Sequence, residues 1–399
     1  MSQIRWYGDC TTGRIVTAVL WVVIAAPSCH GAPNQLPVTN VGDTFRTLML
    51  GWQNSASQIR SLEGYFATLT FNSSAVDPSR AALASLQFYA WARTPTGPAW
   101  VEESRWAYAG KPAFSPPEGL GAYREGIVAV PPEGARKGLW VLRPRPNKKG
   151  PNEQDMTLTW LLQPGPDQDQ WIRDRVETVS VVSDTVDHHE CFCCQMRSKP
   201  LEEQATFTAS LWIDPAVGYR PRRSLTTWRF PKHGAELDVS LPTDFLELEP
   251  GVFLPQKAHS VRARRDAEGK WIWEEQRLIE IVAVSVNKPF SSPVQELLDS
   301  IAPDTPTTQV AYQPRTADEV VIELLPGKRT AEGRPGPREV SVKVLLEKLL
   351  TRLADGPPDA PFPIGTDFEL PRLPGGVPVS SLTLGYASET PDRRNEETR

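Results

Sequence analysis

The spacing of hydrophobic residues changes after residue 61. From Thr44 to Ser61 apolar residues recur every three or four positions, at Phe45, Leu48, Met49, Trp52, Ala56 and Ile59. This spacing predicts a helix with one apolar face, which needs a sheet or another helix to cover it. From Tyr65 to Phe71 the side chains instead alternate with a period of two, as in a strand. The chain therefore begins its folded part with a helix that leads into a strand.

Further strand-like segments follow, separated by turns rich in glycine and proline. They are Leu86–Trp91, Trp100–Tyr108, Tyr123–Val130, Leu139–Leu142, Thr157–Leu162, Arg173–Val182, Glu190–Met196, Ala205–Ile213, Tyr219–Phe230, Glu236–Leu241, Phe245–Leu248, Lys257–Arg265 and Trp271–Val286. About a dozen short strands at this spacing predict a mainly β (α+β) protein with a large, curved or partly closed antiparallel sheet.

Two turns between these segments have a clear mechanism. In Asp214-Pro215-Ala216-Val217-Gly218 the aspartate can cap turn amides, the proline presets φ, and Gly218 can adopt a positive φ. Asp266-Ala267-Glu268-Gly269 is the second predicted hairpin turn. Both turns favour antiparallel neighbours.

Beyond residue 290 the pattern weakens. Residues 291–318 are predicted to be a short helix, Val294–Ile301, followed by a polar linker. Residues 319–386 are predicted to form a small α+β appendage with a strand at Val320–Leu325 and an amphipathic helix at Ser341–Leu353. The charged residues 387–399 are predicted to be a disordered tail. The main domain is predicted to span 43–290.

The N-terminus has the features of an export signal. Arg5 and Arg14 precede an apolar run from Ile15 to Ala26, which is too short to span a bilayer comfortably but fits a secretory signal. We predict a signal peptide at 1–28 and a linker at 29–42. Cys29 is also a candidate for lipidation, and a buried N-terminal helix is a further alternative. The predicted location is the periplasm or cell envelope, with lipid-anchored or peripheral membrane association as an open alternative.

Composition narrows the function classes. The net charge is −5 over 399 residues, and acidic and basic residues are interspersed, so no basic stripe for nucleic acid is present. The 39 prolines are about twice the usual frequency and argue against a mostly helical protein.

One short segment concentrates metal-binding residue types: His188, His189, Glu190, Cys191, Cys193 and Cys194. In a strand, Cys191 and Cys193 point to one face and Cys194 to the other, with neighbours on a face about 6.6 Å apart. Three such ligands would not converge on one ion without a bulge. We therefore predict no metal site. Instead, we interpret Asp187-His188 as a hairpin turn and the cysteines as packed side chains, with a disulfide or redox role and a metal role as alternatives.

Other catalytic patterns are missing from the sequence. It contains no G-x-S-x-G, no H-E-x-x-H and no phosphate-binding glycine loop. His233 and His259 are isolated, and adjacent carboxylates such as Glu102-Glu103 point to opposite faces of a strand. We expect a protein that is not an enzyme and that needs no cofactor.

Several segments together resemble a known family. Ile59-Arg60-Ser61-Leu62 running into Gly64-Tyr65-Phe66-Ala67, the segment 184–191 followed by 212–219, and Phe253-Leu254-Pro255 are similar to LolA/LolB-like outer-membrane lipoprotein-sorting proteins. The resemblance covers about 43–290 and is greatest to a divergent, planctomycete-type branch. It implies an open half-barrel with helices plugging an apolar cavity, which binds lipoprotein acyl chains or other lipids without chemistry.

The leading hypothesis is therefore an exported lipid- or lipoprotein-binding protein that holds an apolar ligand on the concave face of the sheet. The strand tryptophans supply large side chains for such a face, with packing in the core or on the outer face of the sheet as the alternative for each, and the sequence assigns no individual lining residue. They are Trp91, Trp100, Trp106, Trp160, Trp171, Trp212, Trp228, Trp271 and Trp273. The alternatives are a structural or interaction protein of the envelope with a filled core and an envelope protein partner, and a metal- or thiol-dependent enzyme using His188–Cys194.

Overall fold

The fold is described from a computed structural model. The structure describes residues 40–73, 75, 81–94, 97–108, 119–124, 127–130, 138–144, 168–201, 204–231, 234–301, 309–312, 317, 319–325, 339–359, 373 and 375–382. The predicted signal segment, Cys29, His233 and the predicted strand Thr157–Leu162 lie outside these residues.

Within these residues, fifteen strands form one antiparallel sheet, in the order β14-β6-β5-β4-β3-β2-β1-β13-β12-β11-β10-β9-β8-β7-β17. The strands are β1 Ser61–Asn72, β2 Ala82–Thr94, β3 Gly97–Tyr108, β4 Gly119–Arg124, β5 Ile127–Val130, β6 Gly138–Pro144, β7 Val176–Val186, β8 His189–Ser198, β9 Thr206–Asp214, β10 Arg220–Phe230, β11 Gly234–Glu249, β12 Val252–Arg265, β13 Trp271–Val286, β14 Gln309–Tyr312 and β17 Val377–Pro378. β1 to β6 and β7 to β13 are two runs of consecutive neighbours, and the β1–β13 pairing joins them.

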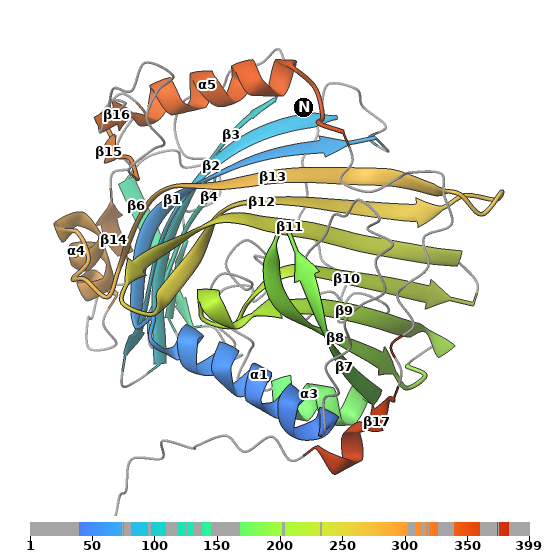
Figure 1. The fold of residues 1–399 in the computed structure, drawn as a ribbon. Helices are drawn as coiled ribbons and strands as arrows, with labels where there is room; N and C mark the ends of the chain where they lie inside the picture. The colour runs from blue at the N-terminus through green and yellow to red at the C-terminus, as the bar shows by residue number, and fades with distance from the viewer. Residues whose placement is uncertain are drawn as a thin grey trace, which may run out of the picture.

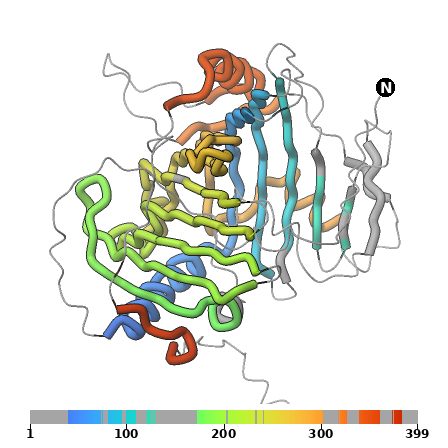
Figure 2. The backbone as a smooth tube through the Cα atoms, turned by 90° about the vertical axis from the view of Figure 1, so that its right-hand side faces the viewer, coloured from blue at the N-terminus to red at the C-terminus, as the bar shows by residue number. Residues whose placement is uncertain are grey.

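The sheet curves strongly but does not close (Figures 1 and 2). Its two edges are β14, which pairs with β6, and β17, which pairs with β7. Both edge strands come from the C-terminal part of the chain. The predicted fold class, a mainly β protein with a large open antiparallel sheet and an N-terminal helix, is confirmed.

The N-terminal helix α1, Val41–Ser57, covers the β7–β10 end of the sheet. Asn40 caps it by accepting a hydrogen bond from the backbone N–H of Asp43. Its apolar face buries Phe45, Leu48, Met49 and Trp52 in a cluster that includes Val179 of β7, Met196 of β8, Leu211 of β9 and Trp228 of β10. Side chains of the helix therefore fill this part of the sheet's face.

The helices α4, Ser292–Ser300, and α5, Val342–Ala354, lie on the opposite face. Two residues that pair across neighbouring strands point to the same face of the sheet. Successive cross-strand pairs connect Leu211 of β9, Ser224 of β10, Ser240 of β11, Ser260 of β12, Arg277 of β13 and Thr70 of β1. Leu211 packs under α1, so Thr70 of β1 is on the α1 side. The neighbours Leu69 and Phe71 point the other way and pack under α5. Figure 1 shows α5 at the top of the picture, beside β2, and α1 at the bottom, near β7.

A small hairpin accompanies α5. Its strands are β15, Val321–Glu323, and β16, Glu339–Ser341, which pair antiparallel. Ser341 then caps α5 by accepting from the backbone N–H of Val344. The leucines of α5 at 345, 346, 349 and 353 are buried against Leu69, Ala84 and Leu86 of β1 and β2.

Some sequence predictions need correction. The segment Arg173–Val182 is a strand only from Val176, because Gln168–Arg175 form the helix α3. The two strands predicted at 236–241 and 245–248 are a single strand, β11, which continues through Pro242. Tyr123–Val130 is a hairpin of β4 and β5 rather than one strand.

The turn between β9 and β10 is built as predicted. Residues 215–217 form a short 3-10 turn, Asp214 accepts from the backbone N–H of Ala216 at 2.7 Å, and Gly218 has φ +69°. A Cβ atom at Gly218 would lie 2.6 Å from Oγ of Ser55 in α1. The turn is therefore also a contact surface for α1.

We expect Gly218→Ala to lower the free energy of unfolding by about 2 kcal/mol, because it combines a strained φ with a steric clash. Gly269 is a matched control: it has φ +82°, but a Cβ there would meet nothing within 4 Å among the described atoms. Gly269→Ala should cost only about 1 kcal/mol. Denaturant unfolding of both variants measures the difference, and equal losses would contradict the contact with α1.

Candidate functional site

The cysteine–histidine segment forms the β7–β8 hairpin. Asp187 and His188 have φ of +48° and +67°, so they are the two central residues of its turn, as predicted. His188 and His189 are exposed. Among the described residues, no group of three histidine, cysteine, aspartate or glutamate side chains is placed to hold a metal ion.

The three cysteines divide between the faces of β8. Cys191 and Cys193 pack with Trp212 and Leu225 on one face, and Cys194 packs with Met196 under α1 on the other. All three are free thiols. Burial raises the pKa of the Cys191 thiol to about 12 and raises the pKa of Cys193 and Cys194 as well.

These thiols should react very slowly in the folded protein, since the thiolate is the nucleophile. The test is a variant with Cys10→Ser and Cys29→Ser, which leaves only these three cysteines. We expect negligible reaction with an aromatic disulfide reagent at mildly alkaline pH, and three thiols titrated after denaturation. Rapid reaction of a native thiol would favour the redox hypothesis instead.

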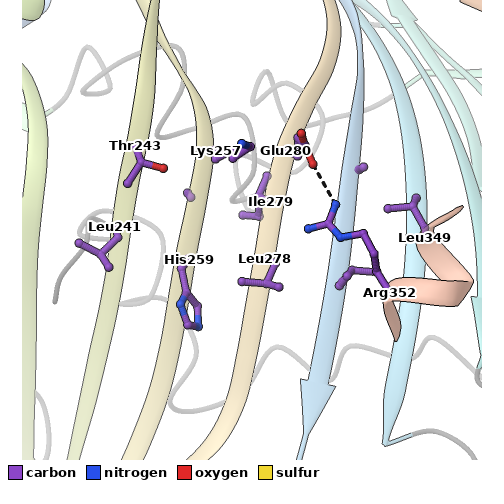
Figure 3. A pocket seen from close by; sticks show the side chains of 12 residues that line it. Leu241, Thr243, Lys257, His259, Leu278, Ile279, Glu280, Leu349 and Arg352 are labelled. Carbon is purple, nitrogen blue, oxygen red and sulfur yellow. Dashed lines mark hydrogen bonds and ion pairs between the residues drawn. The ribbon is translucent and has the colours of Figure 1, made fainter. Parts of the chain in front are cut away.

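A cleft of about 180 Å³ lies between α5 and the sheet (Figure 3). The aliphatic side chains on this face are Ala67 and Leu69 of β1, Leu241 of β11, Leu278 of β13 and Leu349 of α5. Ala258 and Ile279 also border the cleft, but strand alternation directs their side chains to the opposite face of the sheet. The sheet residues are far apart in sequence and are aligned by the β1–β13, β12–β13 and β11–β12 pairings. Leu349 belongs to the apolar face of α5, so the helix forms one wall of the cleft.

Five polar residues complete the lining: Thr243, Lys257, His259, Glu280 and Arg352. Nη1 of Arg352 donates to Oε2 of Glu280 at 2.9 Å, which joins α5 to β13. Nζ of Lys257 donates to Oδ2 of Asp244 at 3.0 Å. Nε2 of His259 lies 2.9 Å from Oε1 of the buried Gln276, and burial lowers the pKa of this histidine below its usual value of 6.5. His259 is therefore neutral at neutral pH.

The chemistry of the cleft favours binding. Cavities of roughly 150 Å³ lined by aliphatic side chains stay dry and bind a molecule the size of benzene. The cleft is of similar size, so it can take a short alkyl segment. It is smaller than the roughly 300–1,000 Å³ typical of sites for drug-sized ligands, so a longer chain needs α5 to move outward. The described residues that line it include no serine and no cysteine.

A second, larger hollow of about 410 Å³ lies between α1 and the turns at Gly218 and Gly251. Its lining includes Asn54, Ser55 and Gln58, together with Gly51 packed on the ring of Tyr219. Most of its described lining residues are polar residues or glycines, and Leu50 is the one aliphatic side chain among them. This hollow fits an acyl chain less well than the α5 cleft.

Sequence reasoning did not find the cleft residues. None of the strand tryptophans is among the described residues that line the cleft. Trp100, Trp212, Trp228 and Trp271 are buried in core clusters instead. Trp160 and the side chain of Trp171 are outside the described residues. The sequence predicts an isolated, structural His259, whereas in the structure this residue borders the cleft. The one sequence signal was the apolar face of α5, which had to cover some surface.

Comparisons with known proteins add little. No protein-family model and no curated protein matches the chain. One similar solved structure is a DUF1329 family protein from Desulfovibrio piger, with TM-score 0.37 and 10% identity over 65% of this chain and 99% of that chain. Another is a putative AttH from Nitrosomonas europaea, with TM-score 0.15 and 9% identity over 64% of this chain and 98% of that chain. At these TM-scores neither likeness shows family or function.

Proposed function

We propose that this protein binds an apolar ligand of the lipid or acyl-chain class in the cleft between α5 and the sheet, and that it does so without converting the ligand chemically. The observation that carries the proposal is the aliphatic lining contributed by three strands, β1, β11 and β13, and by the helix α5. The N-terminal sequence pattern supports the further proposal that the protein acts after export, in the periplasm or cell envelope.

The contacts of α5 show how this wall of the cleft is held in place. The helix is held to the sheet by its leucine face, by the Arg352–Glu280 ion pair and by its hairpin. Val342 donates its backbone N–H to Val320, and Lys343 donates to Ala317, so backbone bonds anchor the start of the helix. Its C-terminal half, with Leu349 and Arg352, borders the cleft. Outward movement of that half would lengthen the site.

The test is lipid extraction and mass spectrometry of the purified protein, together with protection of an apolar fluorescent probe. A cleft-filling variant, Leu278→Trp, should lower probe affinity at least tenfold, because an indole occupies the binding volume. Ile272→Trp is the matched control on the same strand, since Ile272 is exposed and outside the cleft. If no lipid co-purifies and the probe stays unprotected, the proposal is wrong.

A second candidate is a structural or interaction protein of the envelope. The observation favouring it is the other face of the sheet, which α1 fills with four large side chains, each at most 4% exposed. On this account the α5 cleft is only a packing defect. Wild-type protein that binds neither probe nor lipid, but captures a defined envelope protein by cross-linking in cells, would favour this function.

A further inference from the structure

Two basic side chains border the α5 cleft at the same end. Lys257 of β12 is the cross-strand partner of Glu280 in β13, and Arg352 reaches Glu280 from α5. Figure 3 shows Lys257 and Glu280 side by side, with the Arg352 guanidinium directed toward them. The side chains of Arg352 and Lys257 are 49% and 44% exposed, so a ligand can reach both from solvent.

Each cation has donors beyond its ion pair. A guanidinium carries five N–H donors and an ammonium three. Arg352 uses Nη1 for Glu280, and Lys257 makes one hydrogen bond to Asp244. The remaining N–H donors of each side chain can donate hydrogen bonds to an anionic group while the existing ion pairs stay intact. A guanidinium also matches the planar geometry of a carboxylate.

The charged side chains around the cleft bear on which head group it would accept. The lining includes two positive side chains, Lys257 and Arg352, and one negative, Glu280, while His259 is neutral at neutral pH. Asp244 lies outside the lining but pairs with Lys257 at 3.0 Å, so the two cations and the two carboxylates balance in charge. The unused N–H donors of Arg352 and Lys257 therefore carry the preference for an anionic head group, and a cationic head group would approach two cations.

We infer, on the basis of the proposed function, that the ligand is a single aliphatic chain ending in a carboxylate. The carboxylate accepts hydrogen bonds from Arg352 and Lys257, and the chain lies against Leu278, Leu349 and Leu69. The aliphatic lining accounts for the chain, and the paired cations at one end fix its direction in the cleft.

The test compares three probes of equal chain length by calorimetry at neutral pH and low salt: octanoate, octanol and octylamine. We expect octanoate to bind at least tenfold more tightly than octanol, which corresponds to one charge-assisted hydrogen bond. Octylamine should bind most weakly. Equal affinity for octanoate and octanol, or a preference for octylamine, would overturn the carboxylate inference and leave the proposed function standing. Binding of none of the three would contradict the proposed function itself.

Two variants assign the head-group site. Arg352→Gln should weaken octanoate binding about tenfold and leave octanol binding unchanged. Glu280→Gln removes the competing carboxylate and should strengthen octanoate binding several-fold. The matched control is Arg264→Gln, which breaks a comparable exposed pair with Glu274 at 2.9 Å outside the cleft and should change neither affinity. Unchanged octanoate affinity in Arg352→Gln would contradict the assignment.

Discussion

Replacing Phe45 with alanine should lower the free energy of unfolding by about 3–5 kcal/mol. Phe45 is fully buried on the sheet-facing side of α1, in the cluster formed with β7–β10. Truncation removes the transfer free energy of the ring and leaves a cavity, because the strands on the other side are fixed by their ladders. The loss should appear as a shift in the midpoint of denaturant unfolding with little change in slope.

The control for this variant is Leu50→Ala on the same helix. Leu50 is only partly buried and borders the hollow beside α1. Its truncation should cost about 1 kcal/mol, since a smaller apolar area returns to water. Similar losses for Phe45→Ala and Leu50→Ala would show that α1 does not fill the face of the sheet in the way described.

The second large effect is expected at Leu346 of α5, which is fully buried against β1 and β2. Leu346→Asp removes a core side chain and places a carboxylate where no water reaches it. With α5 in place, these two effects should together lower the free energy of unfolding by at least about 4 kcal/mol. If α5 leaves the sheet, the carboxylate stays in water instead. We therefore expect the α5 segment to lose protection in hydrogen exchange while β7–β10 keep theirs, together with loss of probe binding.

Val344→Asp supplies the comparison, because Val344 is on the exposed side of the same helix. It introduces the same charge two residues away and should change the free energy of unfolding by less than about 1 kcal/mol. If Leu346→Asp left α5 protected, the helix would not be held by its leucine face. If it unfolded β7–β10 as well, the two faces would form one cooperative unit rather than separable layers.

Much of the fold could be predicted from local pattern. The spacing of Phe45, Leu48 and Trp52 defines the helix, and the period of two at Tyr65–Phe71 defines the strand that follows. The turn residues Asp214 and Gly218 placed one hairpin correctly, because their chemistry is local. The helix α3 was missed because its residues, QDQWIRDR, carry little apolar periodicity.

The candidate site was not predictable in the same way. Leu69, Lys257, Leu278 and Arg352 come together only through strand pairings that span up to about two hundred residues and through the docking of α5. A sequence shows that α5 has an apolar face but does not show which strands that face covers. The cysteine–histidine segment attracted attention because its residues are adjacent, yet the strand period sends its cysteines to opposite faces.

The most direct measurement of the central claim is isotope-edited NMR of the purified protein with octanoate, using leucine methyl labelling. The account predicts NOEs from the octanoate chain to the methyl groups of Leu69, Leu278 and Leu349 in the α5 cleft. NOEs instead to Leu48 under α1, or the absence of any NOE at saturating octanoate, would contradict it.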